Sequence, residues 1–512
     1  MEIQMFEFVK HIFRFNRRVY LDHNATTPVS ARVRRKMDQA LKSHYGNPSS
    51  FYGIGRKSAE LMEQARGQVA DAIHADAPEI FFTGCATESN NAVLKSVSAH
   101  FYPQKKKIIS TSIEHPSVMN TLAYLESQGI VVEYCAVDGQ GRVLLAELEK
   151  QMDDETFLVC CMLANNETGI IQDVAAVTKI AKQHGALVLT DCVQALGKIP
   201  IDVHEWDVDY ASFSAHKLYG PKGIGALYVK EGSPFAPLLH GGHQESGMRA
   251  GTESIHNIVG FGAACQDVNR LLAHAKQIRA LKRELIQRLK EIKPDCVINS
   301  SETECLPNTI SITFPNLDNA GLMGMLDYRG IAVSAGSACG TGEDVPSHVL
   351  KAMGLSDQSA RETIRVSLGR DTSTRDISYT TKVIRDYIES RAPLVNMLTP
   401  AQLNETILFD NDTYILDVRP SDDRKIRKGL PNAHEVNPLF VENYLQQFPR
   451  DKQILVYCPG GGLSVMISYY LKAKGFKHVT NLRGGLDAWR KRRSDLYEKY
   501  AGQNMTILQP DK

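Results

Sequence analysis

Lys217 stands between two short apolar runs, residues 210–214 (YASFS) and 224–229 (IGALYV), each of which predicts a buried strand. A lysine held between core strands loses water, which lowers the pKa of its amine and frees it to form a Schiff base with a carbonyl compound. The glycines beside it would let the backbone approach a bulky ligand. The same pattern also fits an ordinary lysine on a surface hairpin, and this stretch alone does not choose between the two.

A second group of residues could hold an anion. Residues 79–97 (EIFFTGCATESNNAVLKSV) predict a strand, a Gly/Thr/Ser turn and a helix that begins near Thr87. The N-terminus of a helix exposes unpaired N–H groups and the positive end of the helix dipole, so this turn is a plausible phosphate cradle. Turns of this kind also cap helices that bind nothing.

Polar side chains follow three further predicted strands, namely His115, the pair Asn165 and Asn166, and Asp191 with Gln194 three residues later. Taken singly, each has an ordinary structural explanation, such as a helix N-cap for Asp191. Because strands and helical stretches alternate here, we expect an α/β fold with a mostly parallel sheet. Ligands of such sheets bind at the carboxyl ends of the strands.

These groups are more informative as a set than singly. Pyridoxal phosphate needs a phosphate site, a partner for its ring face, a carboxylate for its pyridine nitrogen and a lysine for its Schiff base. The turn at Thr87, the ring of His115, the carboxylate of Asp191 and the amine of Lys217 supply one of each. The residues therefore predict a pyridoxal-phosphate site.

The composition limits the class of protein. The chain has 512 residues, enough for about three folding units of ~150 residues. Its 59 Lys+Arg nearly equal its 58 Asp+Glu, so no general affinity for nucleic acid or anionic membranes is indicated. Ten scattered cysteines without a C-x-x-C pair favour reduced thiols in a cytoplasmic protein. No apolar run approaches the ~20 residues of a membrane span, and residues 1–18 do not match a signal peptide.

From about residue 19 to about residue 390 the chain resembles the cysteine desulfurases, a branch of the aspartate-aminotransferase-like pyridoxal-phosphate enzymes. The collinear motifs that carry the resemblance are LDHNATTP, GNPSS, ATESNN, EHPSV, NNETG, DCVQALGKIPID, SFSAHKLYGPKGIGALY, GMRAGTES, SAGSAC and IRVSLGR. The resemblance implies fold type I of the pyridoxal-phosphate enzymes, with a large domain, a small α+β domain and L-cysteine as substrate.

The resemblance also implies roles for individual residues. Lys217 would bind the cofactor covalently and carry a proton, His115 would stack on its ring, Asp191 would pair with its pyridine nitrogen, and Gln194 with its ring oxygen. The phosphate would be held by Ala86, Thr87, Ser214 and His216, and Thr252 would reach the phosphate of the neighbouring subunit in a homodimer. Asn166 and Arg365 would bind the substrate carboxylate, and Asn166 would also contact the cofactor.

Small departures from the family pattern remove no functional group that the mechanism needs. Cys85 replaces a usual glycine, Asn91 a frequent aspartate and Cys192 a common alanine. The HGGH segment at 240–243 has too few further ligands nearby for a metal site, and we expect no metal.

Cys339 separates a desulfurase from a transaminase. It follows a short predicted strand in a run of Gly, Ser and Thr, which favours an exposed loop over a buried position. In the family that it resembles, this thiolate attacks the sulfur of L-cysteine and becomes a persulfide, while the substrate leaves as L-alanine.

A second module begins after the prolines near residue 400. A predicted strand at 453–458 ends in Cys458, and the PGGGLS loop and an apolar helix follow. Successive N–H groups in such a loop can stabilise a thiolate or persulfide. The module resembles a rhodanese domain, but Leu463 replaces a usual arginine, so thiosulfate is a doubtful donor. Ser464 stands where the related phosphatase loop needs arginine. A non-catalytic docking module is the alternative.

We therefore expect an N-terminal extension (1–18), a pyridoxal-phosphate cysteine desulfurase domain (19–395), a rhodanese-like domain (396–502) and a tail (503–512). Sulfur would pass from Cys339 to Cys458 and then to an acceptor protein, either an iron–sulfur scaffold or an enzyme of tRNA or cofactor thiolation. The alternatives are a selenocysteine lyase, another class V transaminase-like enzyme, or a non-catalytic sulfur-transfer scaffold.

Overall fold

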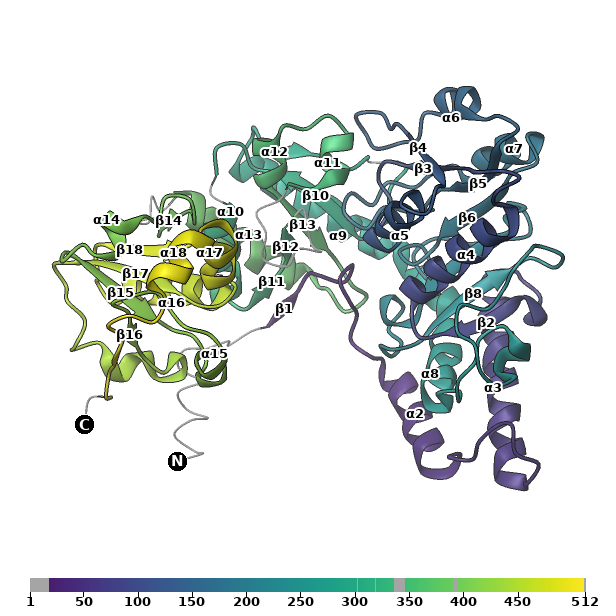
Figure 1. Ribbon diagram of the computed structural model, residues 1–512, viewed down its shortest axis with the longest axis horizontal. Coiled ribbons are helices and arrows are strands. Elements are labelled where there is room, and N and C mark those ends of the chain that lie inside the picture. Colours follow the sequence, from purple (N-terminus) through teal and green to yellow (C-terminus); the bar gives the residue numbers. More distant parts are fainter. Residues whose placement is uncertain (1–17, 302, 318, 336–345, 390–394, 511–512) are drawn as a thin grey trace.

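The computed structural model describes residues 18–510 apart from 302, 318, 336–345 and 390–394. The chain forms three parts in a row (Figure 1), with a large domain at one end, a small domain in the middle and the C-terminal domain at the other end. None of the helices in the described part of the chain combines the length and the apolar character that a membrane crossing requires.

The large domain is built on a seven-stranded sheet of order β2-β8-β7-β6-β5-β3-β4. Its strands are β2 Ile80–Thr83, β3 Lys107–Thr111, β4 Val131–Cys135, β5 Thr156–Cys160, β6 Leu187–Asp191, β7 Tyr210–Ser214 and β8 Gly225–Val229. All neighbouring pairs are parallel except those of β8, which runs antiparallel to both β7 and β2. The prediction of a mostly parallel sheet is confirmed.

Helices cover both faces of this sheet, which is why its strands are apolar along their whole length. Successive residues of β5 show the two faces, because Leu158 packs in the core cluster around α4 and α5 whereas Val159 packs in the cluster on the other side. The helices are α2 Ala31–Ser43, α3 Gly53–Asp71, α4 Ala86–Phe101, α5 Pro116–Glu126, α6 Leu145–Gln151, α7 Val174–Gln183 and α8 Ile255–Cys265.

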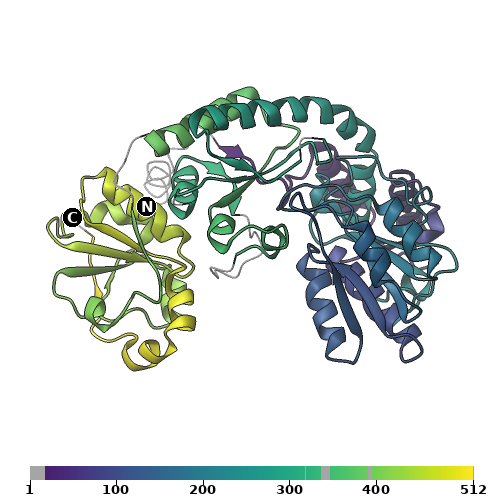
Figure 2. The same ribbon diagram turned by 90° about the horizontal axis from the view of Figure 1, so that it is seen from above.

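The small domain has an antiparallel sheet of order β12-β13-β10-β9, together with the parallel pair β1 and β11. Two of its helices, α9 and α13, lie side by side and form the long upper edge of the molecule in Figure 2. The elements are β1 Val19–Tyr20, α9 Val268–Ile292, β9 Val297–Ile298, β10 Thr309–Thr313, α10 Asn319–Tyr328, β11 Ile331–Ala332, β12 Ser334–Ala335, α11 His348–Ala352, α12 Asp357–Arg361, β13 Thr363–Ser367 and α13 Thr374–Glu389. The predicted α+β domain is confirmed.

The C-terminal domain has a parallel six-stranded sheet of order β14-β18-β17-β15-β16-β19. Strand β19 lies inside the segment expected to be a tail, so these residues form the edge of the sheet. The elements are β14 Asn396–Leu398, α14 Glu405–Leu408, β15 Thr413–Asp417, α15 Ser421–Ile426, β16 His434–Glu435, β17 Gln453–Tyr457, α16 Gly462–Ala473, β18 Val479–Leu482, α17 Gly485–Arg492, α18 Ser494–Tyr500 and β19 Thr506–Ile507.

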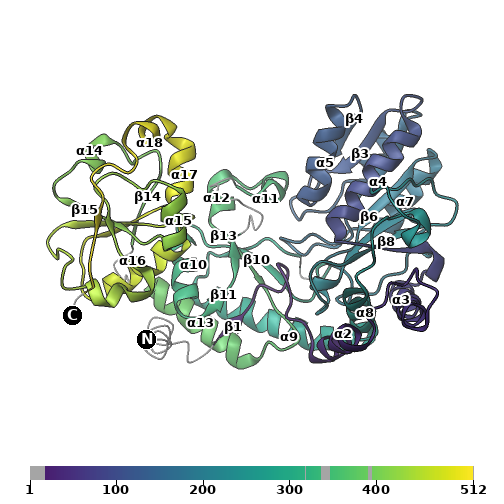
Figure 3. The ribbon, with the colours of Figure 1, turned by 60° about the horizontal axis from the view of Figure 1, so that its bottom comes forward.

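The C-terminal domain docks on the small domain through helix α16, which packs against α10 (Figure 3). Val465 and Tyr469 of α16 join the hydrophobic core of the small domain with Leu322 and Leu326 of α10. The close approach depends on Gly324, because a Cβ at this position would lie 2.0 Å from Cγ1 of Val465. The first turn of α16 is thus held by the neighbouring domain.

Candidate active site

A cavity of about 290 Å³ lies where the carboxyl ends of β6 and β7 face the N-terminus of α4 and the small domain. The structure brings ten of the predicted site residues into its wall. These are Ala86, Thr87, His115, Asn166, Asp191, Gln194, Ser214, His216, Lys217 and Arg365. Thr252 is exposed and does not line this cavity, and Cys339 lies outside the described residues.

Lys217 ends a single 3₁₀ turn, Ala215–Lys217, that directly follows β7. Its Nζ donates hydrogen bonds to the carbonyl oxygens of Asn24 at 2.6 Å and Ala25 at 2.8 Å. The strand and the turn hold the start of the side chain, and the N-terminal segment of the chain holds its end. The side chain of Lys217 therefore lines the cavity, and it is not an exposed side chain on a surface hairpin.

Asp191 is the last residue of β6 and is buried. Its carboxylate accepts hydrogen bonds from Nδ2 of Asn90 and from the backbone N–H of Val193, both at 3.0 Å. These two donors fix the carboxylate while its oxygens keep further acceptor capacity. A protonated ring nitrogen in the cavity would be a suitable additional donor.

His115 caps the N-terminus of α5, and its Nδ1 accepts the backbone N–H of Ser117 at 3.1 Å. In the neutral ring the proton is then on Nε2. Burial lowers the pKa of His115, and Lys217 nearby adds to that effect, although Asp191 opposes it. The ring is therefore neutral near pH 7 and suited to stacking and proton transfer.

The N-terminus of α4 forms the anion-binding part of the cavity. Helix α4 begins at Ala86, and the side chain of its N-cap, Cys85, makes no capping hydrogen bond, so the first N–H groups remain available. Gly225 of β8 lets the strand approach this turn, because a Cβ there would lie 3.0 Å from the Ala86 nitrogen. Burial lowers the pKa of His216 to about 4, so this residue contributes a neutral ring.

Arg365 reaches the cavity from β13 of the small domain and is buried. Its Nη2 pairs with Oδ1 of Asp22 at 2.9 Å, and its Nη1 donates to the carbonyl oxygen of Asn166 at 3.0 Å. The Nε has no partner among the described residues. The guanidinium is thus held in place by protein groups at the cavity wall, where its planar fork suits a substrate carboxylate.

Sequence reasoning assigned no role to three residues that connect these groups, namely Asp22, Asn24 and Lys198. The backbone carbonyl oxygen of Asn24 accepts hydrogen bonds from both Lys217 Nζ and Gln194 Nε2. The Nδ2 of Asn24 donates to the carbonyl oxygen of Asn166 at 3.1 Å. Asp22 and Asn24 lie in the LDHNATTP motif and Lys198 follows Gln194 by four residues. The sequence shows these residues but not their contacts, because the contacting residues lie up to 343 positions apart.

Cys458 directly follows β17, and its Sγ accepts the backbone N–H groups of Gly461 at 3.1 Å and Ser464 at 3.3 Å. The side chain is 2% exposed. Gly485 lets the next loop close over this one, since a Cβ there would lie 2.2 Å from the Cys458 carbonyl oxygen. Leu463 packs against the core of its own domain. The geometry is that of a sulfur-holding loop that works through backbone donors.

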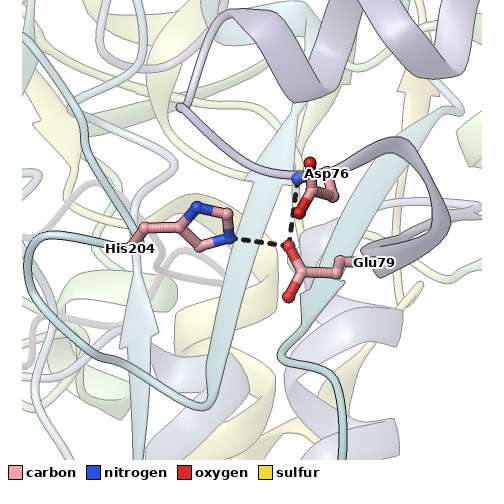
Figure 4. Close-up of side chains that lie close together, drawn as sticks. All are labelled: Asp76, Glu79 and His204. Atoms are coloured by element: carbon pink, nitrogen blue, oxygen red, sulfur yellow. Dashed lines mark hydrogen bonds and ion pairs between the residues drawn. The ribbon is translucent and has the colours of Figure 1, made fainter.

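Among the described residues, Asp76, Glu79 and His204 lie close enough together to hold a metal ion (Figure 4). Glu79 Oε2 accepts the Asp76 N–H at 3.0 Å and pairs with His204 Nε2 at 2.8 Å, and Glu79 Oε1 accepts the Glu231 N–H. Burial alone would raise the pKa of Glu79, but these hydrogen bonds outweigh it and lower the pKa. The cluster is explained as a capped 3₁₀ turn, and the HGGH segment does not belong to it.

The residues of the cavity fit pyridoxal phosphate. Its open helix N–H groups suit a phosphate, the Asp191 carboxylate suits a protonated pyridine nitrogen, and the amine of Lys217 suits a Schiff base with the cofactor aldehyde.

Comparison with known proteins agrees with this site. Residues 19–379 match the aminotransferase class-V family, and residues 399–492 match the rhodanese-like domain. A cysteine desulfurase of Trichormus azollae is 42% identical over 372 residues, which cover 72% of this chain and 93% of the relative. The cysteine desulfurase IscS of Dictyoglomus turgidum is 39% identical over 374 residues, covering 73% and 95%.

Solved structures give the same result. A NifS-like protein superposes with a TM-score of 0.70 at 42% identity, covering 73% of this chain and all of that one. A structure described as SspA in complex with cysteine has a TM-score of 0.62 at 36% identity, covering 68% and 98%. The chain belongs to the class-V aminotransferase family, within its pyridoxal-phosphate-dependent cysteine desulfurases, and it carries a C-terminal rhodanese-like domain.

Proposed function

We propose that this protein takes sulfur from L-cysteine, releases L-alanine, and passes the sulfur from Cys339 to Cys458 and then to an acceptor protein. The observation that carries the first step is a single cavity that holds the amine of Lys217, the carboxylate of Asp191 and the guanidinium of Arg365. The first two groups suit the cofactor and the third suits the carboxylate of an amino acid.

Pyridoxal phosphate supplies an electron sink that lets the substrate lose its α-proton. Arg365, fixed by Asp22, holds the substrate carboxylate at the cavity wall. Lys217 accepts and returns the proton, and neutral His115 has an Nε2–H for a second transfer. In the sulfur step the Cys339 thiolate attacks the substrate sulfur, an S–S bond forms, the C–S bond breaks, and the electron pair left on carbon takes a proton to give alanine.

The first experiment tests Cys339. Cys339→Ser should abolish alanine and sulfide formation from L-cysteine while the bound cofactor keeps its visible absorbance near ~420 nm. Cys296→Ser, which removes a buried cysteine of the small domain, is the control and should retain activity. Undiminished turnover by Cys339→Ser would overturn the assignment of the persulfide to this residue.

The second step rests on the two N–H donors that point at the Cys458 sulfur. Donors of this kind stabilise a thiolate or a persulfide anion without an arginine. With Leu463 in the loop, thiosulfate should be a poor donor. Mass spectrometry after a short exposure to L-cysteine should find the extra sulfur on both Cys339 and Cys458, and in Cys458→Ser on Cys339 alone. Unimpaired delivery to the acceptor by Cys458→Ser would exclude the relay.

We also propose a homodimer in which Thr252 reaches the neighbouring subunit's phosphate site. Thr252 is exposed and lines no part of the cavity of its own chain. Large apolar side chains, Tyr45, Phe51 and Tyr52, are exposed around the start of α3 and would be covered by a partner. Sedimentation should show a dimer that Phe51→Lys weakens, and a wild-type monomer at micromolar concentration would contradict it.

The proposed location is the cytoplasm, and the proposed acceptor is an iron–sulfur scaffold or an enzyme of tRNA or cofactor thiolation. The nine cysteines among the described residues are free thiols, as expected of a reducing compartment. Incubation of the persulfide form with each acceptor class, followed by mass spectrometry of the acceptor, distinguishes these possibilities.

A further inference from the structure

A second lysine, Lys198, lies within hydrogen-bond distance of the proposed cofactor-binding residues. Its Nζ donates to Oε1 of Gln194 at 2.7 Å and to Oδ1 of Asn24 at 3.2 Å. No carboxylate pairs with it among the residues that the structure describes. A lysine whose contacts are two neutral amide oxygens is not there to form an ion pair.

The contact with Gln194 decides which way the side-chain amide points. A glutamine amide has one accepting end, Oε1, and one donating end, Nε2. Lys198 holds the accepting end, so Nε2 donates to the Asn24 carbonyl oxygen at 3.0 Å. The same carbonyl oxygen accepts Nζ of Lys217 at 2.6 Å. The donating end of Gln194 therefore lies beside the lysine that attaches the cofactor.

This orientation matters because the ring oxygen of pyridoxal phosphate is negatively charged when the cofactor is bound through lysine. An N–H group facing that oxygen stabilises its charge, whereas a rotated amide would present a repelling oxygen. Rotation of Gln194 would also place its NH₂ group against the amine of Lys198. A lysine, which has donors only, excludes the rotated form.

We propose that Lys198 is a positioning residue that locks the amide of Gln194, with its donor facing the ring oxygen of the cofactor. The inference rests on the proposed contact of Gln194 with the cofactor and adds a residue for which no role had been assigned. Lys198 is not placed in direct contact with substrate or cofactor.

Lys198 and the charged groups near it act on one another's pKa values. Burial of the amine, together with Lys217 and Arg365, holds the pKa of Lys198 well below its ordinary value. Lys198 in turn helps to lower the pKa of His23 and of His216.

The test is the pH titration of the visible absorbance of the bound cofactor. Lys198→Met removes the donors at similar length, and we expect the midpoint of the titration to rise by about one pH unit, because the loss of one hydrogen bond to a charged group has that size. Lys198→Arg keeps a donor and should titrate like the wild type. Lys222→Met, at an exposed lysine close to Lys217, is the control and should also be unchanged.

A double variant separates positioning from a merely structural role. If Lys198 acts through Gln194, then Gln194→Leu should shift the midpoint by itself and Lys198→Met should add nothing to it. Additive shifts, or an unshifted Lys198→Met protein, would overturn the proposal. If Lys198→Met does not fold, Lys198→Gln, whose amide is too short to reach Gln194, replaces it with the same expectation. A wild-type protein without visible absorbance would contradict the proposed function instead.

Discussion

The cofactor cavity and the Cys458 loop present their reactive groups in opposite ways. Lys217 is held by a carbonyl oxygen 193 residues away in sequence, at Asn24. The sulfur of Cys458 is held by N–H groups only three and six residues further along the chain. The cavity is thus assembled from distant segments of two domains, whereas the loop is complete within one strand–loop–helix unit.

This difference indicates which changes in the protein would disrupt each site. The cavity relies on side chains whose positions depend on the packing of the large and small domains, so a remote change can misplace them. The Cys458 loop relies on backbone donors whose positions follow from the local fold. The small domain and the C-terminal domain meet where α10 packs against α16, and experiments can test each site and this contact.

The largest effect is expected from Lys217→Ala. Loss of the amine that we propose attaches the cofactor and carries the proton should lower alanine formation by about 10³-fold or more. Lys222→Ala, at an exposed lysine, is the matched control. The labelling rate of Cys458 by a thiol reagent, read by peptide mass spectrometry, should not change. A change in that rate would show that the two sites are less separate than their contacts indicate.

A smaller loss of activity is expected from Asn24→Ala, which removes a residue shared by the whole cavity. The variant leaves the amine of Lys198 and the side-chain amide of Asn308 without the Oδ1 acceptor and should lower turnover by about 10²-fold through misplacement of the site. It should also destabilise the protein by about 1–3 kcal/mol because buried donors lose their partner. Turnover and thermal unfolding measure the two effects, and a wild-type turnover would contradict the view of a cavity assembled by long-range contacts.

Gly324→Val tests the place where the two regions touch. Its Cβ would collide with Val465, so α16 should move away from α10. We expect the transfer of sulfur from Cys339 to Cys458 to fall about tenfold, because the thiol of Cys458 loses its fixed position relative to the small domain. Sulfide release from L-cysteine in the presence of a reductant should be retained. Gly67→Val, at a helical glycine with nothing near its missing Cβ, should leave the relay intact.

The smallest effect is expected at Glu167, which follows the cavity-lining residue Asn166 in sequence. Burial raises the pKa of Glu167 to about 7, against 4.5 as the ordinary value. Between these values the folded state binds more protons than the unfolded state, so this residue makes stability fall as pH rises from about 4.5 to about 7. Glu167→Gln should remove that dependence and raise stability at pH 8 by about 1–3 kcal/mol. Denaturant unfolding at pH 5 and pH 8 checks this, and an unchanged pH dependence would refute it.

Much of the cavity could be predicted because its groups lie at the ends of strands. Asp191 ends β6 and Lys217 follows β7 by one turn, and the alternation of strands and helices places such ends at one edge of a parallel sheet. The Cys458 loop could be predicted for a related reason, since a strand, a glycine-rich loop and a helix are consecutive in sequence. What these predictions share is that each depends on local order along the chain.

The sequence by itself determined which chemical groups this protein has, namely an amine, a carboxylate, a phosphate cradle and a loop thiol, because residue type and local pattern carry that information. Only the tertiary structure decided that Asp22 restrains Arg365, that Lys198 orients Gln194, and that Gly324 lets the C-terminal domain dock. These contacts depend on how separate segments pack together in three dimensions. No pattern within one segment specifies that packing.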